Sequence, residues 1–126
     1  MQHSVIKKNG SHGISYSGKH AAIFNNLVYS NGCSGCGDYG ITILGVAGFS
    51  NAKHKITNNT IYGNLSGGLR LSDDQASSVF GTAVNNIIMA NPVGIKEQGG
   101  GASLSTTTTS SLTAVVTRMT TSSWPR

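Results

Sequence analysis

One phrase of nine residues occurs three times in this chain without a gap, and it constrains the possible folds more than any other feature. The copies are IFNNLVYSN at residues 23–31, ITNNTIYGN at 56–64 and AVNNIIMAN at 83–91. A weaker copy, HSVIKKN, occupies residues 3–9. Each copy is followed by a glycine and an aliphatic residue, at Gly13-Ile14, Gly40-Ile41, Gly68-Leu69 and Gly94-Ile95. Two phrases that alternate in strict order indicate a chain built from structural repeats.

The spacing between the copies shows which segments vary in length. Equivalent residues lie 22 positions apart from Ser4 to Asn26, 33 from Asn26 to Asn59 and 27 from Asn59 to Asn86. The phrases keep their length, so the insertions fall in the loops, as a solenoid permits. The leucine grid of leucine-rich repeats and the 3.6-residue periodicity of helical repeats are both missing from the sequence.

The residues within the phrases predict short strands separated by turns. Ile, Val, Thr and Tyr dominate them, and Asn or Gly bounds them, which is typical of strands and turns. Asn tolerates the left-handed backbone of a sharp bend, and Asn side chains stacked at one position per coil can hydrogen-bond to the coils above and below. Alternation along the strands predicts two inward stacks: Ile6, Val28, Ile61 and Ile88, and Ile14, Ile41, Leu69 and Ile95.

These phrases resemble the repeats of right-handed parallel β-helix proteins of the pectate-lyase-like superfamily over residues 3–98. The resemblance implies an all-β fold, a right-handed parallel β-helix (β-solenoid) of about four coils. That superfamily includes lyases, hydrolases, epimerases, phage tail proteins and non-catalytic surface proteins, so it constrains the fold more tightly than the activity. We therefore expect residues 1–98 to form the β-helix repeats.

The composition changes after Gly99-Gly100-Gly101. All 11 asparagines lie at or before Asn91, whereas Ser and Thr dominate the last part of the chain. We expect residues 99–126 to be a Gly-rich linker and a Ser/Thr-rich tail. Two alternatives are an out-of-frame or truncated end and a single closing strand between Leu112 and Met119.

Charge and composition narrow the choice of partners. Charged residues make up 10 % of the chain, against roughly 25 % in an ordinary soluble protein, and surfaces of Asn, Ser, Thr and Gly suit an extracellular solenoid. The net charge of +5 is spread thinly and no run exceeds two basic residues, which disfavours nucleic acid and makes an acidic polysaccharide the better partner. No stretch of the sequence is long and apolar enough to span a membrane.

The ends of the predicted solenoid suggest a larger parent protein. The sequence begins partway through a coil, no secretion signal follows Met1, and no helix is predicted that could cap an open end. We expect a fragment of a longer secreted or cell-surface protein with further β-helix coils.

Two short segments raise the question of metal or redox chemistry. Cys33 and Cys36 form a lone Cys-x-x-Cys, which can be a local disulfide or free thiols, half of a zinc site, or a redox pair. Zinc needs two further ligands, of which His12 supplies at most one, and a secreted setting favours the disulfide. Asp73 and Asp74 are interpreted as turn formers, with calcium binding left open because it needs more oxygen ligands. No cofactor is predicted beyond that possibility of calcium.

The candidate site follows from the resemblance. In that superfamily polysaccharide lies along the outward face of one parallel sheet, which corresponds here to the glycine-aliphatic strands. Their outward column reads Ser15, Thr42, Arg70, Lys96. In lyase members a basic residue takes a proton next to a carboxylate that a cation neutralises. Hydrolase members use grouped carboxylates, which this chain lacks in the family's paired arrangement.

We therefore expect a carbohydrate-binding or carbohydrate-active β-helix, lyase-like or epimerase-like on an acidic polysaccharide. The expected catalytic residues are Arg70, Lys96 and His12, and the expected substrate-binding residues are Thr42, Tyr39 and Asp38. The competing interpretation is a non-catalytic scaffold segment of a surface or adhesion protein. In that case His12 is a turn residue, and Arg70 and Lys96 form a solvated face.

Overall fold

The computed structural model describes residues 1–46, 52–73, 78–99, 101–106 and 114–117, and these residues form short strands and no helix. The strands β3, β6 and β9 each end directly before an Asn-Asn pair of the repeats. The strands are β1 (Val5–Lys7), β2 (Ile14–Ser17), β3 (His20–Phe24), β4 (Leu27–Tyr29), β5 (Tyr39–Leu44), β6 (Ala52–Thr57), β7 (Thr60–Tyr62), β8 (Gly67–Ser72), β9 (Val79–Val84), β10 (Ile87–Asn91), β11 (Ile95–Gln98), β12 (Ala102–Thr106) and β13 (Ala114–Thr117).

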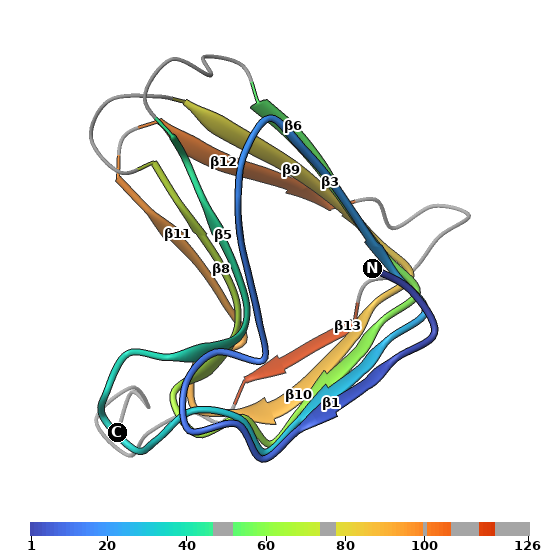
Figure 1. Ribbon diagram of the computed structural model, residues 1–126, viewed down its shortest axis with the longest axis vertical. Coiled ribbons are helices and arrows are strands. Elements are labelled where there is room, and N and C mark those ends of the chain that lie inside the picture. The colour runs from blue at the N-terminus through green and yellow to red at the C-terminus, as the bar shows by residue number, and fades with distance from the viewer. Residues whose placement is uncertain (47–51, 74–77, 100, 107–113, 118–126) are drawn as a thin grey trace, which may run out of the picture.

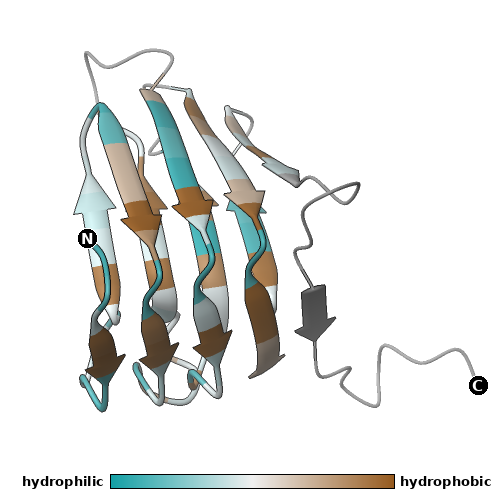
Figure 2. Cartoon of the chain, turned by 90° about the vertical axis from the view of Figure 1, so that its right-hand side faces the viewer, coloured by the Kyte–Doolittle hydropathy of each residue, from teal (hydrophilic) through white to brown (hydrophobic). Residues whose placement is uncertain are grey.

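Three parallel sheets enclose the core. Their strand orders are β1-β4-β7-β10-β13, β11-β8-β5-β2 and β12-β9-β6-β3, so each strand pairs with the one three places further along the chain. Figure 1 shows the sheets as the three sides of a triangular coil, and Figure 2 shows the coils side by side. The chain is therefore a parallel β-solenoid, which confirms the prediction of an all-β parallel β-helix. No helix within the described ranges has the length and apolar character of a membrane span.

Both predicted inward stacks are present. The register pairs Ile6, Val28, Ile61 and Ile88 across one sheet. It pairs Ile14, Ile41, Leu69 and Ile95 across another. Members from the middle coils are fully buried, while Ile6 and Ile95 at the two ends are half-buried. Because each coil adds the same side chain at the same place, the core consists of like residues packed along the solenoid axis.

Each Asn-Asn pair forms a sharp bend between two sheets. The first residue of the pair adopts a positive φ, 57° at Asn25, 55° at Asn58 and 54° at Asn85. Asparagine accepts this left-handed conformation more readily than most other residues. The second residue of each pair turns inward and is buried at Asn26, Asn59 and Asn86. The first asparagine of the pair therefore supplies the left-handed backbone of the bend, and the second supplies the buried side chain.

The buried asparagines form hydrogen-bonded ladders along the axis. Asn59 Oδ1 accepts hydrogen bonds from the backbone N–H and from Nδ2 of Asn26, each at 3.0 Å. Asn86 Oδ1 accepts the equivalent pair from Asn59 at 2.9 and 3.0 Å. A second ladder joins Asn31, Asn64 and Asn91 in the same way. These contacts confirm the predicted stacking and satisfy polar groups that face the interior.

The glycine that opens each second phrase leaves room for the second ladder. A Cβ at Gly40 would lie 2.6 Å from Asn64 Nδ2, and one at Gly13 would lie 2.8 Å from Asn31 Nδ2. Real side chains do not approach so closely, so glycine is required beside each inward asparagine. The two repeated phrases are thus coupled by packing between neighbouring coils.

The sheets continue into the region for which we expected a linker and a tail. β12 pairs with β9 in parallel, and β13 pairs with β10. β13 lies within the segment that the closing-strand alternative proposed. Asp73 accepts a hydrogen bond at 2.8 Å from the N–H of Gly101 just before β12. Asp74 and most of the Ser/Thr-rich segment lie outside the described residues.

Candidate functional site

The outward column on the sheet of β2, β5, β8 and β11 has the predicted register. Ser15, Thr42, Arg70 and Lys96 are successive Cα partners. Their exposure differs, because Ser15 and Lys96 are exposed, Arg70 is half-buried and Thr42 is fully buried. The column is therefore a surface at its ends and is covered at Thr42.

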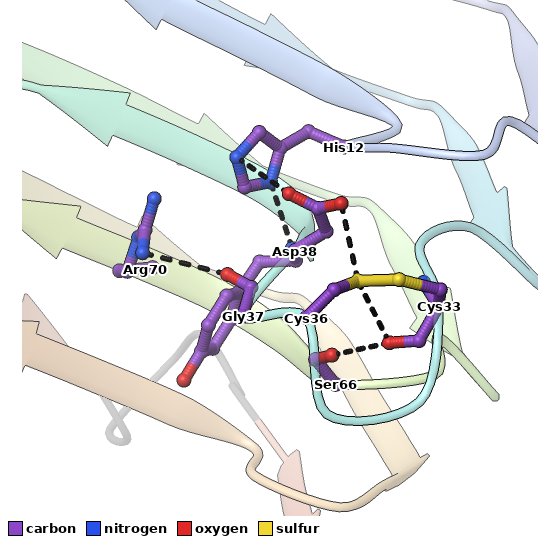
Figure 3. Close-up of a disulfide and its surroundings, with 8 residues drawn as sticks. His12, Cys33, Cys36, Gly37, Asp38, Ser66 and Arg70 are labelled. Atoms are coloured by element: carbon purple, nitrogen blue, oxygen red, sulfur yellow. Dashed lines mark hydrogen bonds and ion pairs between the residues drawn. A yellow bond between two sulfur atoms is a disulfide. The ribbon is translucent and has the colours of Figure 1, made fainter.

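His12 covers Thr42 and binds the start of β5. The backbone N–H of Tyr39 donates to His12 Nδ1 at 2.8 Å, so Nδ1 is the acceptor nitrogen of the ring. Nε2 then carries the hydrogen and faces Asp38 Oδ1 at 3.3 Å. Thr42 Oγ1 lies 3.1 Å from the same Nδ1, and the acceptor role of that nitrogen makes the hydroxyl the donor. Figure 3 shows the imidazole between the strand and the Asp38 carboxylate.

These contacts determine what His12 and Thr42 can do. Both ring nitrogens of His12 are engaged, so in this arrangement the ring has no free lone pair with which to take a proton from a substrate. Thr42 has no exposed surface to offer a ligand. In this arrangement the His12 ring joins the Asp38 carboxylate to the backbone of Tyr39 and contacts the Thr42 hydroxyl.

Arg70 lies against the ring of Tyr39. Its Cζ is 5.2 Å from the ring centroid, a cation–π distance, and its Nη1 is 3.5 Å from the carbonyl of Gly37. The tyrosine ring fits because its register partner is Gly67, where a Cβ would overlap the ring. Burial raises the pKa of Tyr39 and the Arg70 charge lowers it in part. The phenol therefore stays neutral at physiological pH and serves as a platform for the guanidinium.

Arg70 and Lys96 lack acidic partners in the described part of the chain. They are Cα partners on adjacent strands, which lie about 4.8 Å apart. Within the described ranges the one ion pair joins His12 to Asp38. Two neighbouring cations without a carboxylate repel each other, and a bound anion would relieve that repulsion.

The loop before β5 is held by a disulfide. Cys33 and Cys36 are joined, which agrees with the disulfide alternative. The hydroxyl of Ser66, one coil further on, donates to the carbonyl of Cys33 at 2.7 Å. Asp38 lies close enough to both sulfurs to complete a small metal-binding group, but sulfurs joined to each other are not thiolate ligands. The disulfide therefore fixes the loop that carries Asp38 (Figure 3).

A shallow hollow of ≈ 350 Å³ has Tyr39 in its lining. It lies between the disulfide loop and the turn of Leu65 and Ser66, and Pro92 and Tyr39 also line it. Because Arg70 stacks on Tyr39, the tyrosine connects the hollow to Arg70. Sequence reasoning did not identify this hollow, since its walls come from loops of different length in successive coils.

The structure brings together most of the residues that the sequence indicated. His12, Asp38, Tyr39 and Thr42 are in direct contact, and Arg70 joins them through Tyr39. The role of Gly67 in admitting the tyrosine ring was missed, although its place beside Gly68 departs from the repeat. Comparisons with protein-family models, with curated proteins and with solved structures gave no match.

Proposed function

We propose that the outward face of the β2-β5-β8-β11 sheet binds an acidic polysaccharide. The observation that carries the proposal is the pair of in-register cations, Arg70 and Lys96, without an ion-pair partner among the described residues. Arginine engages a carboxylate in bidentate fashion, and lysine adds a point charge. A polymer lying along the solenoid axis would meet the two cations in succession.

The surroundings of the pair support binding of a sugar chain. Tyr39 holds the Arg70 guanidinium from one side, so less conformational entropy is lost when a ligand binds. The hollow beside Tyr39 offers hydroxyl and backbone groups from Ser34 and Ser66, which suit sugar hydroxyls. A secreted or cell-surface setting fits the disulfide in the adjoining loop.

A lyase-like or epimerase-like reaction on the bound polymer is the second candidate. The resemblance to the pectate-lyase-like superfamily favours it, together with the exposed Lys96 beside Arg70. In a lyase reaction a base removes the proton next to the uronate carboxylate, a cation stabilises the developing charge, and the glycosidic oxygen leaves. Lys96 would be the base and Arg70 the cation, because both nitrogens of His12 are occupied.

The test compares oligouronates with neutral oligosaccharides of the same length by isothermal titration calorimetry. The variants are Arg70→Gln with Lys96→Gln, and a control of equal charge, Lys7→Gln with Lys8→Gln. Hydrogen bonds to charged groups contribute roughly 1.5–3 kcal/mol each, so the first variant should bind oligouronate on the order of 100-fold more weakly. The wild-type affinity should also fall with added salt.

Two outcomes would reject the binding proposal. One is equal wild-type affinity for charged and neutral chains, and the other is equal loss in the two double variants. Either result would favour the scaffold interpretation. Ultraviolet absorbance of an unsaturated product tests the lyase reaction, which the proposal predicts to disappear in Lys96→Gln while oligouronate binding is partly retained.

A further inference from the structure

A second groove runs along the outward face of a different sheet, the one formed by β3, β6, β9 and β12. Its volume is ≈ 380 Å³. One wall is the in-register row Lys53, Phe80, Ser103, and the other is the row Lys55, Thr82, Ser105. The backbone between the rows forms the floor at Gly81. The groove therefore runs parallel to the solenoid axis and crosses three strands.

The β6 end of this groove is cationic. Lys53 and Lys55 are both exposed and stand two residues apart on one strand, so they point to the same side. None of the described strands β3, β6, β9 and β12 contains an Asp or a Glu. The two lysines have no ion-pair partner within the described ranges. This end is suited to one anionic group held between two ammonium groups.

The other end has a different character. Glu97 reaches β12 and accepts the backbone N–H of Leu104 at 2.8 Å, which makes the β12 end unfavourable for an anion. The side chains that line the groove there are the hydroxyls of Ser103 and Ser105, which both donate and accept hydrogen bonds. A ligand that fits both ends carries its negative charge at the β6 end and neutral hydroxyls at the β12 end.

The middle of the groove is aromatic on one side. Phe80 is 38 % exposed, and it stands in register between Lys53 and Ser103. Thr82 faces it from the opposite row. An exposed ring flanked by hydroxyls offers a flat apolar surface to the C–H face of a sugar, together with partners for its hydroxyls.

We propose that this groove is a second carbohydrate site, which binds an oligosaccharide whose terminal residue carries a carboxylate or a sulfate. The anionic group lies between Lys53 and Lys55, and the following sugars lie over Phe80 and the hydroxyl rows. A free inorganic anion would leave most of the groove empty, because its volume is in the range of sites for larger ligands. The proposal is independent of the Arg70 face, which belongs to another sheet.

The ligands for the test are a glucuronate-terminated trisaccharide, its glucose-terminated neutral counterpart, a trisaccharide with a terminal sulfate, and inorganic sulfate alone. Titration calorimetry is carried out on the wild type, on Lys53→Gln with Lys55→Gln, and on Phe80→Ser. The equal-charge variant Lys7→Gln with Lys8→Gln serves as the control, and Arg70→Gln with Lys96→Gln removes the separate contribution of the Arg70 face. Circular dichroism verifies that each variant is folded.

We expect the Lys53/Lys55 variant to bind the glucuronate or the sulfated trisaccharide at least tenfold more weakly than wild type. Phe80→Ser should also weaken binding, and the Lys7/Lys8 control should not. The preferred trisaccharide identifies the anion. If the Arg70/Lys96 variant loses oligouronate binding but keeps the binding that depends on Lys53 and Lys55, the two sites are independent of each other.

Several results would overturn the proposal. One is that the wild type binds the neutral trisaccharide as tightly as the charged ones. Another is that inorganic sulfate binds as tightly as either charged trisaccharide. A third is that the Lys7/Lys8 control loses as much affinity as the Lys53/Lys55 variant. Vesicles containing phosphatidylserine provide a further test. Tighter Lys53-dependent binding to them than to either charged sugar would assign the groove to a membrane surface instead.

Discussion

Replacement of one ladder asparagine should destabilise the whole solenoid, and Asn59→Ala tests this in the middle coil. The Asn59 side chain is 1 % exposed. Its Oδ1 accepts two hydrogen bonds from Asn26, and its Nδ2 donates to the carbonyl of Ile23 and to Asn86 Oδ1. Alanine removes all four bonds and leaves their partners in an interior that water does not reach.

The magnitude follows from those contacts. A hydrogen bond contributes about 1 kcal/mol net, and a buried group left without a partner costs about 1–3 kcal/mol. Asn86 Oδ1 keeps its bond to the backbone N–H of residue 59 and Asn26 Nδ2 keeps its bond to Met1, so some groups remain satisfied. We expect Asn59→Ala to lower the free energy of unfolding by roughly 3–5 kcal/mol, a large share of the 5–15 kcal/mol of a typical domain.

Urea unfolding followed by far-ultraviolet circular dichroism measures this change. The matched control is Asn58→Gly, at the exposed neighbouring position with φ of 55°. Glycine adopts that backbone conformation freely, so the control should change stability by less than about 1 kcal/mol. Equal destabilisation by the two substitutions would refute the idea that the inward ladder, rather than the bend, is the source of stability.

Two further predictions concern packing and pH. Gly40→Ala should destabilise the fold by roughly 1–3 kcal/mol, because the new Cβ would lie 2.6 Å from Asn64 Nδ2. The control is Gly10→Ala, where the new Cβ would have open space. Similar urea midpoints for the two variants would contradict the prediction. Burial, and to a smaller extent His20, lower the pKa of His54. The unfolded chain therefore binds the proton more readily, and stability should fall as pH drops below about 6.5. His54→Leu should flatten that dependence, and an unchanged pH slope of the urea midpoint would contradict it.

The sequence predicted which residues of the candidate site lie close together, but not the hydrogen bonds that they form. The sequence indicated His12, Asp38 and Tyr39 because each lies just before a strand of the column, and the structure places them in contact. It could not show that the His12 ring contacts the Thr42 hydroxyl, since that depends on the path of two loops. His12 was expected among the catalytic residues, and the hydrogen bonds between coils occupy both nitrogens of its ring.

The sequence by itself determined the architecture of the coils. A phrase repeated with constant length forces like residues into register, so the stacks through Ile61 and Leu69 and the ladder through Asn59 follow from the spacing alone. The physical reason is local, because strand alternation, the left-handed bend and the glycine beside each asparagine all act within one coil or between neighbours.

Only the tertiary structure revealed the features that are formed by residues differing from one coil to the next. The groove of Lys53 and Phe80 has no counterpart in the repeated phrases, because its walls join residues that vary from coil to coil. β12 shows the same effect, since a Ser/Thr-rich segment without the repeat pattern becomes a strand along the edge that β9 offers. Unpaired backbone groups at that edge favour pairing whatever the side chains are, and composition alone does not reveal such an edge.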